Sequence, residues 1–142
     1  WEELKKKEKN RDSVLNGVPK TLPALSRAQR IQEKASSVGF DWKNINPVID
    51  KIDEEIVELK DAIDENDIEK INDEMGDVLF SLINLCRFLK INSESALRST
   101  ISKFEFRFKN IEKLADQKGL RLSDLSLEEM DDMWNKVKKN NI

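Results

Sequence analysis

The sequence predicts an all-α protein, and two observations lead to this prediction. Apolar residues recur every three or four positions through most of the chain, as they do along one face of an amphipathic helix. No segment shows the two-residue alternation that is typical of a half-buried strand. With 142 residues, the chain has the length of one domain that buries its own core.

The first half of the chain contains two expected helices and the start of a third. The first begins after Pro23 and ends by Gly39. The second begins at Pro47, with Asn46 as its N-cap, and runs to just before Asn66. A short turn at Asn66 leads into the third helix, so we expect these two helices to be antiparallel neighbours.

The third predicted helix is long and ends near residue 89. Its second half, VLFSLINLCRFL, is apolar nearly all round, so we expect it to be buried centrally or in a subunit interface. A fourth helix begins near Ser93 and is stopped by Gly119. The last helix begins with a capping box formed by Ser126 and Glu129.

Residues 1–20 are mostly charged and carry a break at Gly17 and Pro19, so we expect a linker or N-terminal extension there. The compact domain is then residues 21–142. The chain begins with Trp1 rather than Met and shows no signal-peptide pattern, so we expect a piece of a longer, cytoplasmic protein. No apolar run approaches the ~20 residues of a membrane-spanning helix, and no membrane partner is expected.

The amino-acid composition excludes several classes of catalytic site. The chain has no His, no Tyr and one Cys, Cys86, which removes His-based triads, His-based metal sites, zinc ribbons and intramolecular disulfides. Carboxylates are the metal ligands that remain, and oxygen ligands favour Mg²⁺, with Mn²⁺ as an alternative. The acids are concentrated, since residues 50–77 contain 13 Asp or Glu and three Lys.

Four of these acids are predicted to converge. Glu55 and Glu58 lie on the second helix, and Glu74 and Asp77 lie on the third, each pair at i and i+3. At about 100° per residue, both pairs are offset in the same sense from the apolar stripe, which places them on one flank of an antiparallel pair. Shared divalent cations are one way to keep such a group ionised. The alternative is that these acids face solvent without a ligand.

Cationic and aromatic residues elsewhere suit a phosphate-bearing ligand. Lys70 is on the same flank as the acids, while Lys103 and Arg107 are one turn apart on the fourth helix. On the last helix, Trp134 either stacks on a nucleobase or packs in the core, and Lys138 either binds phosphate or faces solvent.

The segments EEIVE and EMGD resemble the EExxE and ExxD motifs of the all-α nucleoside triphosphate pyrophosphohydrolases. LPALSRAQRIQEKASSVGFDW, EMGDVLFSLINLCRFL, KFEFRF and MWNKVK are similar, in the same order, to the MazG branch of that family. The resemblance covers roughly residues 20–140. It implies a helical bundle completed by dimerisation, and Mg²⁺-dependent hydrolysis of NTPs, with broad base specificity, to NMP and pyrophosphate.

The resemblance also implies roles for individual residues. The metal-binding positions are Glu55, Glu58, Glu74 and Asp77, and Glu55 or Glu58 would also orient or deprotonate the attacking water. The positions that contact nucleotide are Lys70, Lys103, Arg107, Trp134 and Lys138. Relatives that carry two related domains differ from this chain, which has one acidic constellation. The chain resembles their second, C-terminal domain with its linker, or a natural single-domain relative.

The expected partners are an NTP and a second copy of the chain, in a homodimer or higher assembly, and no nucleic acid. Three alternatives stay open at this point. The chain is a regulatory module that binds nucleotide and metal without turnover, or a pyrophosphatase restricted to dUTP or dCTP, or a structural bundle with solvated acids.

Overall fold

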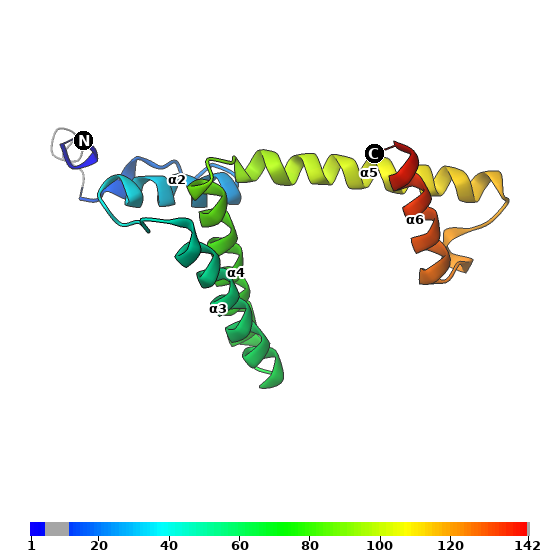
Figure 1. Ribbon diagram of the computed structural model, residues 1–142, viewed down its shortest axis with the longest axis horizontal. Coiled ribbons are helices and arrows are strands. Elements are labelled where there is room, and N and C mark those ends of the chain that lie inside the picture. The colour runs from blue at the N-terminus through cyan, green and yellow to red at the C-terminus, as the bar shows by residue number, and fades with distance from the viewer. Residues whose placement is uncertain (5–11, 142) are drawn as a thin grey trace. The chain divides into compact units, whose positions relative to one another are not determined.

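The computed structural model describes residues 1–4 and 12–141, and the regular elements there are all helical (Figure 1). The all-α prediction is confirmed. The expected linker at 1–20 falls partly on residues 5–11, which lie outside the described residues. The elements are the 3₁₀ helices η1 (Val14–Gly17) and η2 (Leu122–Asp124) and the α-helices α2 (Ala24–Ser37), α3 (Ile45–Asp64), α4 (Ile68–Phe88), α5 (Ser93–Gln117) and α6 (Leu127–Asn141).

The chain forms two compact units, Trp1–Glu94 and Ser95–Ile142. The first contains η1, α2, α3 and α4, and the second contains most of α5 together with η2 and α6. Each unit is described by itself.

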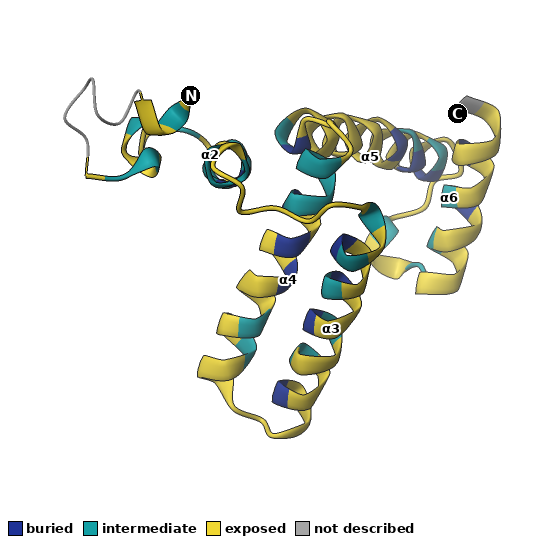
Figure 2. Ribbon diagram, turned by 60° about the vertical axis from the view of Figure 1, so that its left-hand side comes forward, coloured by how far each residue is buried: buried dark blue, intermediate teal, exposed yellow. Residues whose placement is uncertain are grey.

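The centre of the first unit is a hairpin of two antiparallel helices, α3 and α4, as the short turn predicts. Their buried residues lie along the sides that face each other, and the outer sides are exposed (Figure 2). The turn depends on Asn66, whose φ of 54° is in the left-handed region that Asn tolerates. Asp67 then caps α4 by accepting a hydrogen bond from the Lys70 backbone N–H at 3.3 Å.

Two glutamines attach α2 to the neighbouring backbone of the first unit. Gln32 is buried and donates to the Phe80 carbonyl at 2.9 Å. Gln29 donates to the Ile91 carbonyl at 2.8 Å and accepts from the Ser93 N–H at 2.8 Å. The two bonds of Gln29 satisfy backbone groups in the turn where α4 ends and α5 begins, and they hold that turn against α2.

The predicted start of α3 is wrong by two residues. Asn44, with an extended backbone at φ −145° and ψ 172°, is the N-cap, so Asn46 lies inside the helix and Pro47 is its third residue. Proline is tolerated there because the first N–H groups of a helix have no partner within the helix. Proline is therefore compatible with any position in the first turn, so Pro47 did not identify the first residue of α3.

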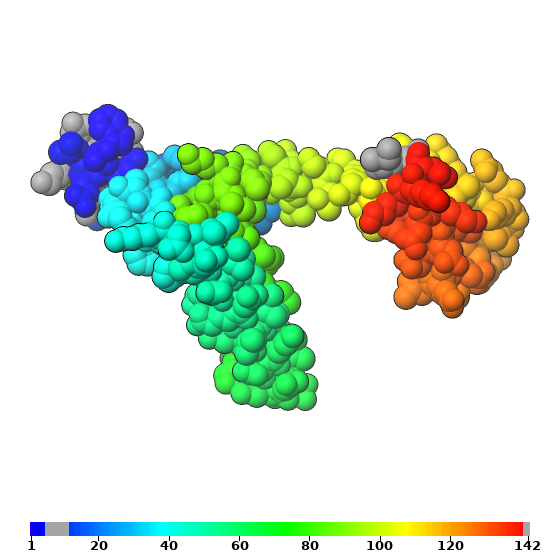
Figure 3. Space-filling model, in the orientation of Figure 1, coloured from blue at the N-terminus to red at the C-terminus, as the bar shows by residue number. Residues whose placement is uncertain are grey.

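The second unit has a small core of its own. Ile111 of α5 packs with Met133 and Val137 of α6, and these two helices lie against each other in the space-filling view (Figure 3). The predicted capping box is confirmed: the Ser126 N–H donates to Glu129 Oε1 and the Glu129 N–H donates to Ser126 Oγ, each at 3.1 Å. The partly buried residues around this core are Leu114, Leu122, Leu125 and Trp134.

The apolar half of α4 is only partly buried within the first unit. Leu79, Phe80 and Leu82 are 43 to 50% exposed, although Val78 and Ile83, which flank them in the sequence, are buried. Gly76 also faces open space, because a Cβ built there meets no atom within 4 Å. The alternative location, a subunit interface, stays a prediction. In the described part of the chain, no helix has both the length and the apolar character needed to cross a bilayer.

Candidate active site

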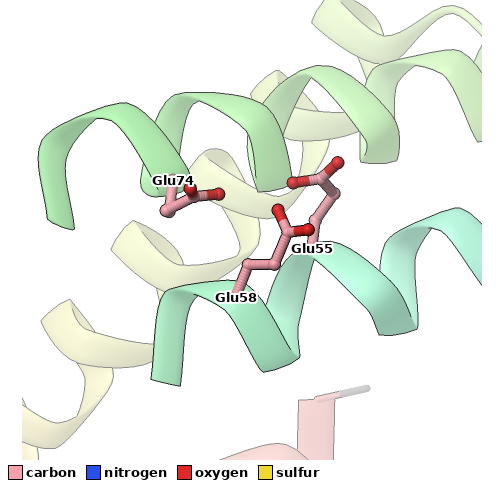
Figure 4. A group of neighbouring side chains, drawn as sticks. All are labelled: Glu55, Glu58 and Glu74. Atoms are coloured by element: carbon pink, nitrogen blue, oxygen red, sulfur yellow. The ribbon is translucent and has the colours of Figure 1, made fainter. Parts of the chain in front are cut away.

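Three carboxylates converge between α3 and α4. Glu55 and Glu58 project from α3 and Glu74 projects from α4, and their side chains point toward one another (Figure 4). One oxygen from each lies within 4.8 Å of the others. The i, i+3 spacing puts the two α3 carboxylates on one face, and the antiparallel hairpin brings α4 to meet them.

Burial makes this group unusual among surface acids. Glu55 is only 6% exposed, and its Oε1 pairs with Lys51 Nζ at 3.1 Å. Its Oε2 is buried without a hydrogen-bond partner, and so is Oε2 of Glu74. Buried carboxylate oxygens are ordinarily satisfied by a donor or a cation, so two such oxygens on facing helices are suited to bind a positive ligand.

The neighbouring charges change the acidity of the third member of the group. The charge of Glu55 is the main cause that raises the pKa of Glu58, with loss of solvent and the charge of Glu74 adding to it. Glu58 therefore holds a proton more readily than an isolated glutamate, while its side chain stays exposed.

Asp77, the fourth predicted ligand, belongs to an overlapping group. Its carboxylate lies with those of Asp73 and Glu74, with ligand atoms within 4.8 Å of one another. Partial loss of solvent raises the pKa of Asp77, and the charges of Asp73 and Glu55 raise it further. Glu74 is common to both groups, so the predicted quartet is arranged as two clusters that share one residue.

Two lysines lie close to these acids, and sequence reasoning singled out one of them. Lys70 Nζ pairs with Glu65 Oε2 at 2.9 Å, at an open hollow of about 180 Å³ that Glu58 and Glu74 also line. Lys51, which was not predicted, pairs with Glu55, and this contact raises the pKa of the lysine. The i, i+4 spacing of Lys51 and Glu55 was the signal that could have found it.

The remaining predicted residues belong to the second unit. Arg107 is 8% exposed, and its guanidinium carbon lies 5.7 Å from the ring centroid of Trp134. Trp134 is half-buried against the core of this unit, whereas Lys103 and Lys138 are exposed. Arg107 and Trp134 thus form a pair that the sequence spacing did not predict.

A larger hollow, of about 420 Å³, lies along α2 and does not include the carboxylate groups. Its charged lining residues, Arg30 and Glu33, already pair with each other at 3.3 Å. The carboxylates of the hairpin are therefore the stronger candidate for chemistry.

The donor set of the hairpin fits a hard divalent cation. It consists of carboxylate oxygens alone, with the buried Oε2 atoms of Glu55 and Glu74 unpartnered, and such ligands suit Mg²⁺ or Mn²⁺. No other ligand type among the described residues joins the two groups.

Comparison with known proteins gives the family. The model of the MazG nucleotide pyrophosphohydrolase domain matches residues 44–112, the stretch that contains all four carboxylates. A Thermotoga maritima protein named nucleoside triphosphate pyrophosphohydrolase/pyrophosphatase MazG is 47% identical over 140 residues, which is 97% of this chain. The chain belongs to the MazG family. The predicted family resemblance is confirmed.

Two other relatives are also longer than this chain. The nucleoside triphosphate pyrophosphohydrolase of Escherichia coli K12 is 41% identical over 149 residues, which covers this whole chain. The uncharacterized protein YabN of Bacillus subtilis is 46% identical over 142 residues, or 98% of the chain. The chain spans 54% of the Thermotoga protein, 56% of the Escherichia coli protein and 29% of YabN.

Proposed function

We propose that this MazG domain hydrolyses nucleoside triphosphates to nucleoside monophosphate and pyrophosphate with Mg²⁺ as cofactor. The observation that carries the proposal is the pair of buried, unpartnered carboxylate oxygens on Glu55 and Glu74, beside the exposed carboxylate of Glu58. The names of the Thermotoga and Escherichia coli relatives support the reaction class.

Four carboxylates would hold the cation: Glu55, Glu58, Glu74 and Asp77. When bound, Mg²⁺ would neutralise charge on the polyphosphate and lower the pKa of a coordinated water. Lys51 reduces the negative charge at the buried end of the group by pairing with Glu55 Oε1. The second oxygen of Glu55 is then left for the cation.

Glu58 is the residue best suited to accept a proton from the attacking water. Its carboxylate is exposed and accessible to solvent, whereas Glu55 is buried and paired with Lys51. The water oxygen forms a bond to the α-phosphorus as the bond between that phosphorus and the α–β bridging oxygen breaks. The water proton goes to Glu58, and the bridging oxygen leaves with pyrophosphate.

Cationic residues would hold the phosphates. These are Lys70 in the first unit and Lys103, Arg107 and Lys138 in the second, with Trp134 beside Arg107. Because these contacts address phosphate rather than the base, broad base specificity is the expectation. A product assay distinguishes this broad specificity from two alternatives, a restriction to dUTP or dCTP and nucleotide binding without turnover.

A homodimer or larger assembly is part of the proposal. The exposed apolar side chains of α4 support it, because association with a second copy would remove them from water. A single domain over residues 21–142 and a cytoplasmic location remain predictions.

The test is a product assay with each common NTP and dNTP, with and without Mg²⁺. We expect Mg²⁺-dependent NMP and pyrophosphate from wild type. Glu58→Gln should remain folded and lose turnover, because the amide cannot accept the proton, while Glu69→Gln, an exposed acid on α4 outside both groups, should retain it. NDP and phosphate as products, or normal turnover by Glu58→Gln, would refute the mechanism.

A further inference from the structure

We propose that Trp134 is a positioning residue that holds Arg107 ready for phosphate, rather than a platform for the nucleobase. The inference rests on the proposed function and assigns the contribution of Trp134 within it. Its evidence lies entirely within the second unit of the structure.

The side chain of Arg107 is mostly buried, and its guanidinium has no anionic partner among the described residues. It is 8% exposed, yet within residues 1–4 and 12–141 it makes no hydrogen bond or ion pair. Its polar contact is the face of Trp134, with the guanidinium carbon 5.7 Å from the ring centroid. No nitrogen of Arg107 is among the buried side-chain atoms that lack a partner, so its N–H groups are open to solvent although most of the side chain is buried. What holds the guanidinium in this position therefore needs an explanation.

The indole ring supplies part of that explanation. A guanidinium over a Trp face is attracted by the ring quadrupole, and the attraction strengthens as water is excluded. Unlike a carboxylate partner, an aromatic ring leaves the net positive charge of Arg107 intact and does not use up its N–H donors. Arg107 is therefore held in place while its capacity to bind phosphate bidentately is preserved.

The other contacts of Trp134 fix the ring further. Phe104 lies 5.3 Å away between ring centroids with a tilt of 41°, and Phe108 stacks on Phe104 at 5.9 Å and 14°. The ring also packs against the core formed by α5 and α6. Phe104 and the core hold the indole ring of Trp134 in place, and the ring in turn restricts the position of the Arg107 guanidinium. A role through Arg107 does not depend on which base the nucleotide carries.

Inorganic tripolyphosphate is the probe that separates the two roles, because it has phosphates but no base. Its affinity for the full chain is measured by titration calorimetry in millimolar Mg²⁺. We expect Trp134→Leu to weaken binding about tenfold and Trp134→Phe about threefold, since Phe keeps a weaker cation–π face. If Trp134→Leu does not fold, the Phe variant alone decides.

A double-mutant cycle tests whether the tryptophan acts through the arginine. In an Arg107→Leu background, Trp134→Leu should cause no further loss of tripolyphosphate affinity. Trp42→Leu makes the same chemical change in a loop of the first unit and should leave that affinity unchanged.

Three results would overturn the inference. Tripolyphosphate binding that is unchanged in the Trp134 variants, with altered discrimination among nucleotides, would mean base stacking. Additive losses in the cycle would mean that Trp134 acts independently of Arg107. If wild type neither binds tripolyphosphate nor hydrolyses any NTP, the proposed function is refuted, and this inference with it. That outcome is distinguishable from the other two because it is seen in wild type, before any substitution is made.

Discussion

Replacing Glu74 with glutamine should make the protein more stable without cations and remove its stabilisation by them. Glu74 Oε2 is buried without a partner, and its carboxylate lies within 4.8 Å of that of Glu55. At that distance two unit charges repel by about 1 kcal/mol even at the dielectric constant of water. Glu74→Gln removes this repulsion and introduces an amide donor toward Glu55, so we expect a gain of about 1 kcal/mol, or about 3–5 °C in Tm.

The assay is thermal unfolding in chelator and in millimolar Mg²⁺. At a free cation concentration of about ten times Kd, wild type should gain about 1.4 kcal/mol and overtake the variant, whose cation site lacks a ligand. Glu69→Gln, on the exposed face of the same helix, should follow wild type in both buffers. Lower stability of Glu74→Gln in chelator, or an undiminished Mg²⁺ response, would refute the assignment of these carboxylates to a cation.

Two further predictions concern packing and pH. Arg87 donates two hydrogen bonds to Asp41, at 2.7 and 3.0 Å, which lower the pKa of Asp41, so Asp41→Asn should cost about 1 kcal/mol near neutral pH. Urea unfolding measures the difference in free energy of unfolding between wild type and Asp41→Asn. This difference should be constant above about pH 3.9, the pKa of Asp in the unfolded chain, and should vanish as the pH falls through the lower pKa of Asp41 in the folded protein. A difference that stays constant down to low pH would contradict this prediction. Leu79 is 50% exposed, and burying its exposed surface in a dimer interface would contribute about 2 kcal/mol over the two copies. Leu79→Glu should therefore weaken self-association at least about 30-fold, as measured by sedimentation. Leu127→Glu, at an 80% exposed position, is its control, and a wild type that sediments as a monomer would contradict the assembly.

Helix positions were predictable because the packing information is local. Apolar residues at three- and four-residue intervals locate α2 to α6, and the Ser126–Glu129 pair marks the start of α6 because both partners lie within one turn. The start of α3 was predicted two residues late because Asn44 and Asn46 are both acceptable caps. Cap choice there depends on the backbone conformation of Asn44, which the sequence does not show.

The candidate site was predictable only as far as helix geometry reaches. Residue spacing gives the helix faces on which Glu55, Glu58 and Glu74 lie, and the antiparallel pairing of α3 and α4 brings these faces together. Side-chain partners were not predictable in the same way. Lys70 has several acids within reach, and the choice of Glu65 depends on rotamers. The contact of Arg107 with Trp134 joins different helices, and no local pattern encodes it.

The tight turn at Asn66 has a consequence for how the site comes into being. Glu55 and Glu74 are 19 positions apart in the chain, and the helices that carry them are joined by a turn of three residues, 65–67. Closing so short a segment costs little chain entropy, and contacts of this kind form early in folding. During synthesis from the N-terminus, both halves of the carboxylate group emerge before α5 and α6 exist. The three carboxylates can therefore come together within one hairpin, from residues of the first unit alone.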